Sequence, residues 1–339
     1  MMKAWILKTS ASVDTRPLVL GDVPTPDARE DELLVRVSAC GICRTDLHVV
    51  EGELPVRLSP VIPGHQIVGC VAAVGSQVAD FAINDRVGIA WLNRTCGKCK
   101  YCVSGRENLC DQALFTGWSV NGGYAEYAIA PASFTYRIPD NFEDIQAAPL
   151  LCAGIIGYRC LRLTGLNGND WRGARLGIYG FGAAGHICIQ LARYRGAEVY
   201  VCTRDRGRHQ ALAHELGATW VGDAAEDPPV KLDTAIIFAP AGELVPIALK
   251  ALAKGGTLVL GGIHMSPIPS FAYSLIYGER MVRSVANNTR EDGREFLVEA
   301  ARVPVRTHVQ PFPFEQVNEA LIALKHDAIR GAGVIVRTE

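Results

Sequence analysis

The residues best suited to chemistry are four cysteines that crowd into one short segment. Cys96, Cys99, Cys102 and Cys110 lie within fifteen residues, in the pattern C-x2-C-x2-C-x7-C. Four thiolates this close can complete a tetrahedral zinc shell, the closed type of site that leaves no position for a substrate. Free thiols and an iron–sulfur cluster are the alternatives that the spacing leaves open. We expect a structural zinc site.

A second set of metal-binding residue types is scattered along the chain. Cys43, His65 and Cys152 each lie in a short motif that is rich in small residues. Two thiolates and one imidazole that leave a fourth position vacant form the catalytic type of zinc site. Taken singly, each residue is better explained by packing, since cysteine often behaves as a small buried hydrophobe. This set therefore depends on a fold that brings three distant segments together.

Size and composition limit what kind of protein carries these cysteines. The chain has 339 residues, and a single core stops growing at roughly 250–300 residues, so two domains are expected. A net charge of -1 gives no reason to expect a nucleic-acid partner. The N-terminal apolar run is too short for a signal peptide or a membrane span. We expect a cytoplasmic protein without a membrane partner, in which 11 cysteines serve metals or catalysis rather than disulfides.

The pattern of apolar residues changes near residue 150. Before it, short alternating runs separated by Pro, Gly and Asp predict a β-rich domain, with strands near 33–37, 67–74 and 124–130. After it, strands alternate with helices, which predicts an α/β domain with a doubly wound parallel sheet. The expected elements are strands at 176–179, 198–202, 234–238 and 257–260, and helices at 183–194, 208–216 and 244–252. A helix at 314–324 and a strand at 334–337 are expected in the tail.

A glycine-rich turn follows the first strand of the α/β half. Gly180, Gly182 and Gly185 form G-x-G-x-x-G between an expected strand and an expected helix. In this position the glycines permit a tight turn, close approach of a pyrophosphate and close helix–strand packing. A glycine-rich turn without a ligand is the alternative, because the bare motif recurs by chance. The position between a strand and a helix favours a dinucleotide. A protein that already carries this two-electron carrier has no need of a redox-active metal, which favours zinc over iron in the cysteine lobe.

The end of the next strand indicates which dinucleotide binds. A site that prefers NAD carries Asp or Glu about 20 residues beyond the glycines, where it accepts hydrogen bonds from the ribose. Here that position is Thr203, and Arg204 follows it. A hydroxyl and a guanidinium can bind a 2′-phosphate, so we predict NADP(H). NAD(H) stays as the alternative, with Asp205 binding the ribose from a slightly different register.

With these motifs in order, the chain resembles the zinc-containing alcohol dehydrogenases of the medium-chain dehydrogenase/reductase superfamily, from about residue 3 to the C-terminus. The resemblance rests on residues 43–48, 64–65, 151–154, 180–185 and 329–331 and on the cysteine lobe. It implies a GroES-like catalytic domain, 1–150, completed by 287–339, and a Rossmann cofactor-binding domain, 151–286. The two separate ligand sets predict two zinc ions per subunit. Cys43, His65 and Cys152 would hold the catalytic one.

The resemblance implies roles for further residues. The Thr45 hydroxyl would receive the alcohol proton and pass it through the cofactor ribose to His48 at the surface. Asp46 would orient the histidine that binds zinc, as carboxylates commonly do. Arg44 and Arg330 would contact the cofactor pyrophosphate, because guanidinium forks suit phosphate.

Substrate and assembly follow from the same resemblance. The substrate would be a primary alcohol, aliphatic or aromatic, or its aldehyde. The side chains of Leu54, Trp91 and Phe115 would line its pocket. A homo-oligomer is expected, a tetramer rather than a dimer, through an edge strand near 281–285. Gln66 departs from the glutamate that commonly follows the zinc histidine, so any step that needs that carboxylate is in doubt.

Two other classes of function remain open. A zinc ribbon that binds nucleic acid would explain the four cysteines, but the near-neutral charge argues against it. A catalytically inactive cofactor-binding sensor would keep this fold, since a fold alone does not fix a function. The intact set of Cys43, His65 and Cys152 favours an enzyme.

Overall fold

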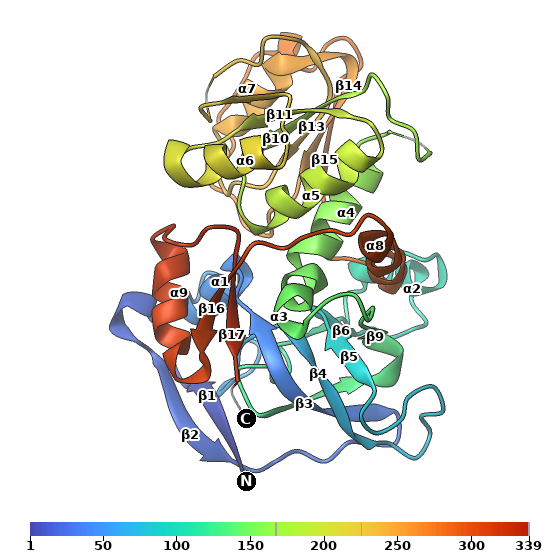
Figure 1. Ribbon diagram of the computed structural model, residues 1–339, viewed down its shortest axis with the longest axis vertical. Helices are drawn as coiled ribbons and strands as arrows, with labels where there is room; N and C mark the ends of the chain where they lie inside the picture. The colour runs from blue at the N-terminus through green and yellow to red at the C-terminus, as the bar shows by residue number, and fades with distance from the viewer. Residues whose placement is uncertain (167, 225, 338–339) are drawn as a thin grey trace. The chain divides into compact units, whose positions relative to one another are not determined.

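The computed structural model describes residues 1–166, 168–224 and 226–337 (Figure 1). The chain divides into two compact units, which are described here one at a time. Unit 1 contains Met1–Cys152, Thr289–Ala301 and the chain from Thr307 onward. Unit 2 contains Ala153–Asn288 and Arg302–Arg306.

Unit 1 is built on a mixed sheet that joins both ends of the chain. Its order is β16-β17-β3-β4-β5-β9, with β8 also paired to β3. The strands are β3 (Glu32–Gly41), β4 (Gln66–Val74), β5 (Arg86–Ile89), β8 (Tyr127–Pro131), β9 (Thr135–Arg137), β16 (Val309–Pro313) and β17 (Ala332–Val336). In β3, Val35 and Val37 are buried while Arg36 between them is exposed, the alternation expected of a strand with one face on a core. Strand β17 pairs with β3, so the tail completes the sheet.

Shorter elements surround this sheet. Two small antiparallel pairs are β1 (Met2–Leu7) with β2 (Leu18–Val23), and β6 (Leu92–Arg94) with β7 (Leu114–Phe115). The helices of unit 1 are α1 (Arg44–Glu51), α2 (Lys100–Val103), α3 (Asp144–Ala147), α8 (Arg290–Arg302) and α9 (Val317–Lys325). Its short 3-10 turns are η1 (Val13–Thr15), η2 (Glu107–Leu109), η3 (Ala132–Phe134), η4 (Ala148–Leu151) and η7 (Phe314–Gln316). The predicted helix at 314–324 is therefore η7 followed by α9.

Unit 2 is a parallel sheet with helical crossovers. The order is β12-β11-β10-β13-β14-β15, all pairs parallel. The strands are β10 (Arg175–Tyr179), β11 (Glu198–Cys202), β12 (Trp220–Gly222), β13 (Leu232–Ile237), β14 (Leu252–Leu260) and β15 (Met281–Ser284). The helices are α4 (Ala153–Leu163), α5 (Ala183–Tyr194), α6 (Ala211–Glu215) and α7 (Leu244–Ala251), with turns η5 (Arg206–Gln210) and η6 (Tyr273–Leu275). The predicted fold class, a β-rich GroES-like part plus a doubly wound Rossmann sheet, is confirmed.

The strand order of unit 2 reverses direction at β10. Strands β11 and β12 lie on one side of β10, and β13 to β15 lie on the other. In open parallel sheets ligands bind beyond the carboxyl ends of the strands at such a reversal. The glycine-rich turn begins at Gly180, directly after β10, so it lies at this position. Among the described residues, no helix is long and apolar enough to span a bilayer.

Candidate active site

The pairing of β3 with β4 brings two candidate metal ligands together. Gly41, the last residue of β3, lies opposite Gln66, the first residue of β4. The segments that follow β3 and precede β4 are therefore neighbours, and they carry Cys43 and His65. Cys152 follows η4, a turn that packs against both strands. The ligand atoms of Cys43, His65 and Cys152 all lie within 4.8 Å of one another.

His65 is held in the orientation that a metal ligand needs. Its Nδ1 lies 2.8 Å from Asp46 Oδ1, and both side chains are buried. The other oxygen of Asp46 accepts a hydrogen bond from the backbone N–H of Cys43 at 2.9 Å. The buried Nε2 of His65 has no hydrogen-bond partner among the described residues. Because Nδ1 is bonded to a carboxylate, Nε2 keeps its lone pair, which fits a zinc ligand.

The two thiols of this cluster are electrostatically linked. Their sulfur atoms lie 4.0 Å apart. A hydrogen bond from the Cys152 thiol holds the pKa of Cys43 well below its usual value, although burial opposes this. The same contact with Cys43, together with burial, raises the pKa of Cys152 well above its usual value. Without a cation only one of the pair ionises readily, so a divalent cation is what would stabilise both thiolates together.

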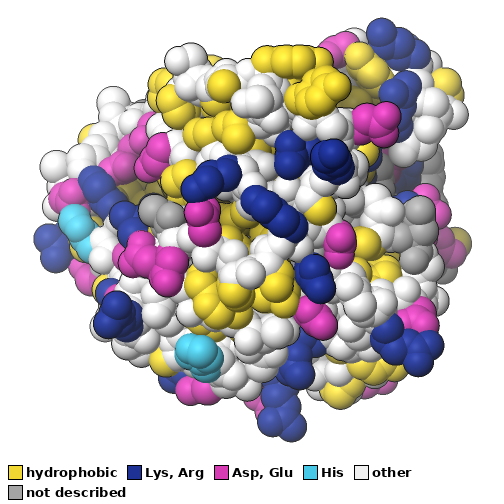
Figure 2. Space-filling model, turned by 90° about the horizontal axis from the view of Figure 1, so that it is seen from above, with side chains coloured by type: hydrophobic (Ala, Val, Ile, Leu, Met, Phe, Trp, Pro, Cys, Tyr) yellow, Lys and Arg dark blue, Asp and Glu magenta, His cyan; other side chains and the backbone are white. Residues whose placement is uncertain are grey.

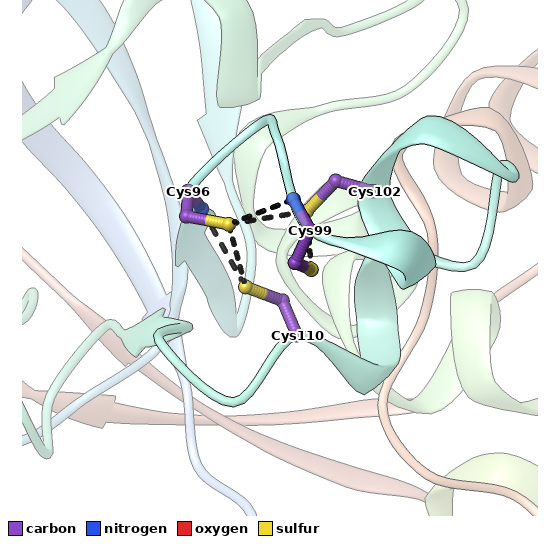
Figure 3. Close-up of side chains that lie close together, drawn as sticks. All are labelled: Cys96, Cys99, Cys102 and Cys110. Atoms are coloured by element: carbon purple, nitrogen blue, oxygen red, sulfur yellow. Dashed lines mark hydrogen bonds between the residues drawn. The ribbon is translucent and has the colours of Figure 1, made fainter.

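The four cysteines of the lobe converge on one point (Figure 3). Sulfur–sulfur distances are 3.5 Å for Cys99–Cys102, 3.6 Å for Cys96–Cys110 and 3.9 Å for Cys96–Cys102. Backbone N–H groups of Lys98 and Cys99 lower the pKa of Cys96 to about 6, whereas burial raises that of Cys110 to about 11. All four are free thiols within 4.8 Å of each other. This donor set fits a closed tetrahedral zinc shell.

Helix α1 carries the residues predicted to move protons. Thr45 is buried, and its hydroxyl oxygen lies 3.8 Å from Cys43 Sγ. The expectation that His48 lies at the surface is wrong, because His48 is buried and its Nδ1 is hydrogen-bonded to the Glu53 carboxylate. Arg44, the first residue of α1, is exposed, and so is Arg330, which precedes β17. The structure thus places Thr45 beside the metal-binding cluster.

An aromatic wall, formed by Trp91, Phe115 and Trp118, extends from His65. The rings of His65 and Trp91 meet edge to face with centroids 5.0 Å apart. Trp91 stacks on Phe115 at 5.1 Å and on Trp118 at 5.7 Å. The guanidinium carbon of Arg57 lies 4.4 Å from the centroid of the Trp118 ring. The sequence analysis missed Trp118, Arg57 and Glu53.

Each glycine in the glycine-rich turn of unit 2 has its own structural reason. Gly180 has a φ of 89°, and a Cβ there would lie 2.9 Å from the backbone nitrogen of Ala239. A Cβ at Gly185 would lie 2.9 Å from the Gly180 carbonyl oxygen. Both positions therefore require glycine for packing. An added Cβ at Gly182, just before α5, meets nothing within 4 Å, so the helix N-terminus opens onto free space where a phosphate fits.

The residues beyond β11 define the second part of a nucleotide site. Thr203 is buried, and its N–H donates to the Gly222 carbonyl at 3.0 Å. Arg204 is exposed. Asp205 has a φ of 60° and accepts hydrogen bonds from Arg208 at 2.6 Å from Nε and 2.9 Å from the backbone nitrogen. These bonds lower the pKa of Asp205, so the alternative ribose ligand is already engaged.

Charge on the surface is mixed rather than gathered. Figure 2 shows one face, on which Lys and Arg side chains are interspersed with Asp and Glu. The formal net charge of the chain is -1. This face carries no broad patch of one sign that would attract a polyanion.

Comparison with known proteins gives consistent matches along the chain. The family model described as the alcohol dehydrogenase GroES-like domain matches residues 29–140, and the zinc-binding dehydrogenase model matches residues 183–302. The probable alcohol dehydrogenase AdhA of Mycobacterium tuberculosis is 48% identical over 99% of this chain and 97% of its own length. An alcohol dehydrogenase of Geobacillus stearothermophilus is 36% identical over 94% of this chain and 96% of its own.

Solved structures show the same architecture. The structure of a cinnamyl alcohol dehydrogenase from Sorghum bicolor superposes with a TM-score of 0.90 at 28% identity. It covers 99% of this chain and 97% of its own.

Proposed function

The chain belongs to the zinc-binding alcohol dehydrogenases, and from that membership we propose that it interconverts primary alcohols and aldehydes with NADP(H) as the hydride carrier. Unit 1 is the catalytic domain and unit 2 the cofactor-binding domain. Each subunit takes two zinc ions, one catalytic and one structural. The buried, unpaired Nε2 of His65 between two thiols is the observation that carries this proposal.

The residues of unit 1 divide the work of the reaction. A zinc ion held by Cys43, His65 and Cys152 would supply Lewis-acid polarisation of the substrate oxygen. Thr45, beside Cys43, accepts the proton that the substrate hydroxyl loses and gives up its own hydroxyl proton to the relay. His48, three residues further along α1, carries that proton toward solvent. Asp46, through its bond to Nδ1, keeps His65 in the ligand tautomer.

The aromatic wall supports a preference for aromatic primary alcohols over small aliphatic ones. Trp91 contacts the metal-binding His65 directly, so a substrate at the metal lies against its ring. Aromatic pairs gain about 0.5–1.5 kcal/mol beyond their area burial, which favours a flat substrate. Trp91→Ala should lower kcat/KM for benzylic alcohols far more than for ethanol. Equal losses on both substrates would contradict a role in selectivity.

The choice of NADP(H) is supported by Thr203 and Arg204. Thr203 offers a hydroxyl and no carboxylate at the end of β11, while the exposed Arg204 can bind a phosphate dianion. The engagement of Asp205 by Arg208 weakens the NAD(H) alternative. The test is the ratio of kcat/KM for the two cofactors in wild type and Thr203→Asp. A wild type that prefers NAD, or a variant that does not shift toward NAD, would sink the assignment.

A homo-oligomer, a tetramer rather than a dimer, is supported by the edge of the unit 2 sheet. Strand β15 ends the sheet order, and Met281 and Val282 on it are 50% and 41% exposed. An apolar edge strand is a template for pairing with a second copy. Light scattering that finds a monomer at micromolar concentration would refute this.

The activity itself is tested by absorbance of the reduced nicotinamide, across a panel of alcohols and aldehydes. Cys43→Ser should abolish turnover, whereas Cys70→Ser should retain it. Cys70 is a matched control because it is a free, half-buried cysteine in β4, outside both metal-binding clusters. Metal analysis should return two zinc ions per subunit. A wild type that turns over no alcohol or aldehyde would contradict the proposed function.

A further inference from the structure

We propose that Glu53 is a positioning residue for His48, which fixes the ring tautomer and balances the charge that the ring gains with a proton. The inference rests on the proposed function, in which His48 carries the substrate proton toward solvent. It assigns a role to a carboxylate that the sequence motifs do not single out. The contact behind it is the hydrogen bond between His48 Nδ1 and the Glu53 carboxylate.

The backbone after α1 brings Glu53 back to the helix. Gly52 ends α1 in the left-handed conformation with a φ of 78°. A Cβ at Gly52 would lie 3.0 Å from Ser10 Cβ, so there is little room for a side chain at position 52. The N–H of Leu54 then donates to the His48 carbonyl at 3.2 Å. The chain therefore folds back over His48. Glu53 lies within this reversal, directly before Leu54 in the sequence.

The pair of His48 and Glu53 joins a largely buried ring to a half-exposed carboxylate. The His48 side chain is 11% exposed, whereas that of Glu53 is 44% exposed. A carboxylate on Nδ1 selects the tautomer that carries a proton there, which leaves Nε2 as the nitrogen that can accept one. This is the orienting role that a carboxylate plays for a general-base histidine.

Several other charges near α1 are paired with each other. The charged or titratable groups on α1 or on the elements that pack against it include Arg44, Asp46, Glu51, Asp14, Lys325 and His326. Asp46 binds His65, and Lys325 binds both Asp14 and Glu51. Glu53 contacts His48 itself.

The proposed step conserves its proton. Nε2 of neutral His48 accepts the proton that the substrate hydroxyl releases through the relay from Thr45, so the ring becomes a cation beside the Glu53 carboxylate. The cation then releases one proton to water and returns to the neutral ring.

The kinetic test compares Glu53→Gln with wild type in alcohol oxidation across pH. Removal of the charge should lower the plateau of kcat/KM about three- to tenfold, a fraction of what a general base supplies. Glu53→Asp, which keeps the carboxylate, should return kcat/KM toward the wild-type value. Glu51→Gln is the matched control, since it removes the same charge from the last residue of α1, whose carboxylate binds Lys325.

A second readout does not depend on turnover. In protein with ¹⁵N-labelled histidine, the ring nitrogens of His48 report the tautomer, and His48→Asn assigns them among the 8 histidines. Wild type should show the proton on Nδ1, and Glu53→Ala should lose this preference. Wild-type tautomer in Glu53→Ala, or an equal loss of kcat/KM in Glu51→Gln, would overturn the inference. Absence of all turnover in wild type would instead refute the proposed function, while the tautomer still tests the role of Glu53.

Discussion

Replacing Asp46 with asparagine should weaken zinc binding at the Cys43, His65 and Cys152 site by about 10–100-fold. Asp46 uses both of its oxygens, one on His65 Nδ1 at 2.8 Å and one on the Cys43 backbone N–H at 2.9 Å. Asparagine keeps one acceptor oxygen and turns an NH2 group toward the other donor. One buried donor is then unpaired, at a cost of about 1–3 kcal/mol. That range matches the affinity loss, which is about 1.4–2.8 kcal/mol.

The assay is chelator competition on the zinc-loaded protein, followed by kcat/KM at saturating zinc. Asp22→Asn is the control, because it makes the same chemical change in an exposed pair with Lys3, whose contribution is about 0–1 kcal/mol. It should leave zinc affinity unchanged. If Asp46→Asn also bound zinc within about twofold of wild type, the reasoning on hydrogen-bonded ligands would be refuted.

Three further predictions concern the lobe, the ion pair that anchors it and the nucleotide turn. Cys99→Ser should lower the thermal midpoint of unfolding, whereas Cys43→Ser should abolish turnover at a nearly unchanged midpoint, because a closed zinc site contributes to folding; calorimetry that finds equal midpoints would contradict this. Burial raises the pKa of the Glu107 carboxyl, but its ion pair with Arg290 outweighs burial and lowers that pKa, so the stability that the pair contributes is present above about pH 4.3 and is lost as pH falls further. The thermal midpoint of Glu107→Gln should therefore approach that of wild type in acid. A difference in midpoint that stays constant with pH would contradict this. Gly182→Ala should leave the midpoint intact yet raise the Kd for reduced cofactor in a fluorescence titration, since its Cβ enters open space before α5; an unchanged Kd would exclude a ligand there.

Local sequence patterns predicted the bounds of those helices and strands that end at a glycine or where the spacing of apolar residues changes. The helix at 183–194 and the strand at 198–202 have the predicted bounds, because Gly182 and Gly196 limit the helix on either side. The helix expected at 208–216 differs, since it begins with a π-turn at Arg206. Asp205 caps that turn through the backbone N–H of Arg208, a contact that hydrophobic spacing does not encode.

The site was predictable in its residue types but not in its contacts. Cys43, His65 and Cys152 could be named from their motifs, yet only the register of β3 against β4 brings the first two together. The roles of Trp118 and Arg57 depend on ring stacking between separate segments, which no spacing rule reports. The contact of Glu53 could have been predicted from the sequence. A glycine after a short helix indicates that the chain reverses there, so the residue after it is expected to contact the last turn of the helix.

The chain that reverses at Gly52 makes two properties of the protein difficult to alter separately. Within 52–58 it carries both Glu53, on His48, and Arg57, on the ring of Trp118. Engineering that repacks this loop for bulkier substrates would therefore also disturb the contact that we propose positions His48. Variants of this loop should be screened for substrate range and for proton transfer together.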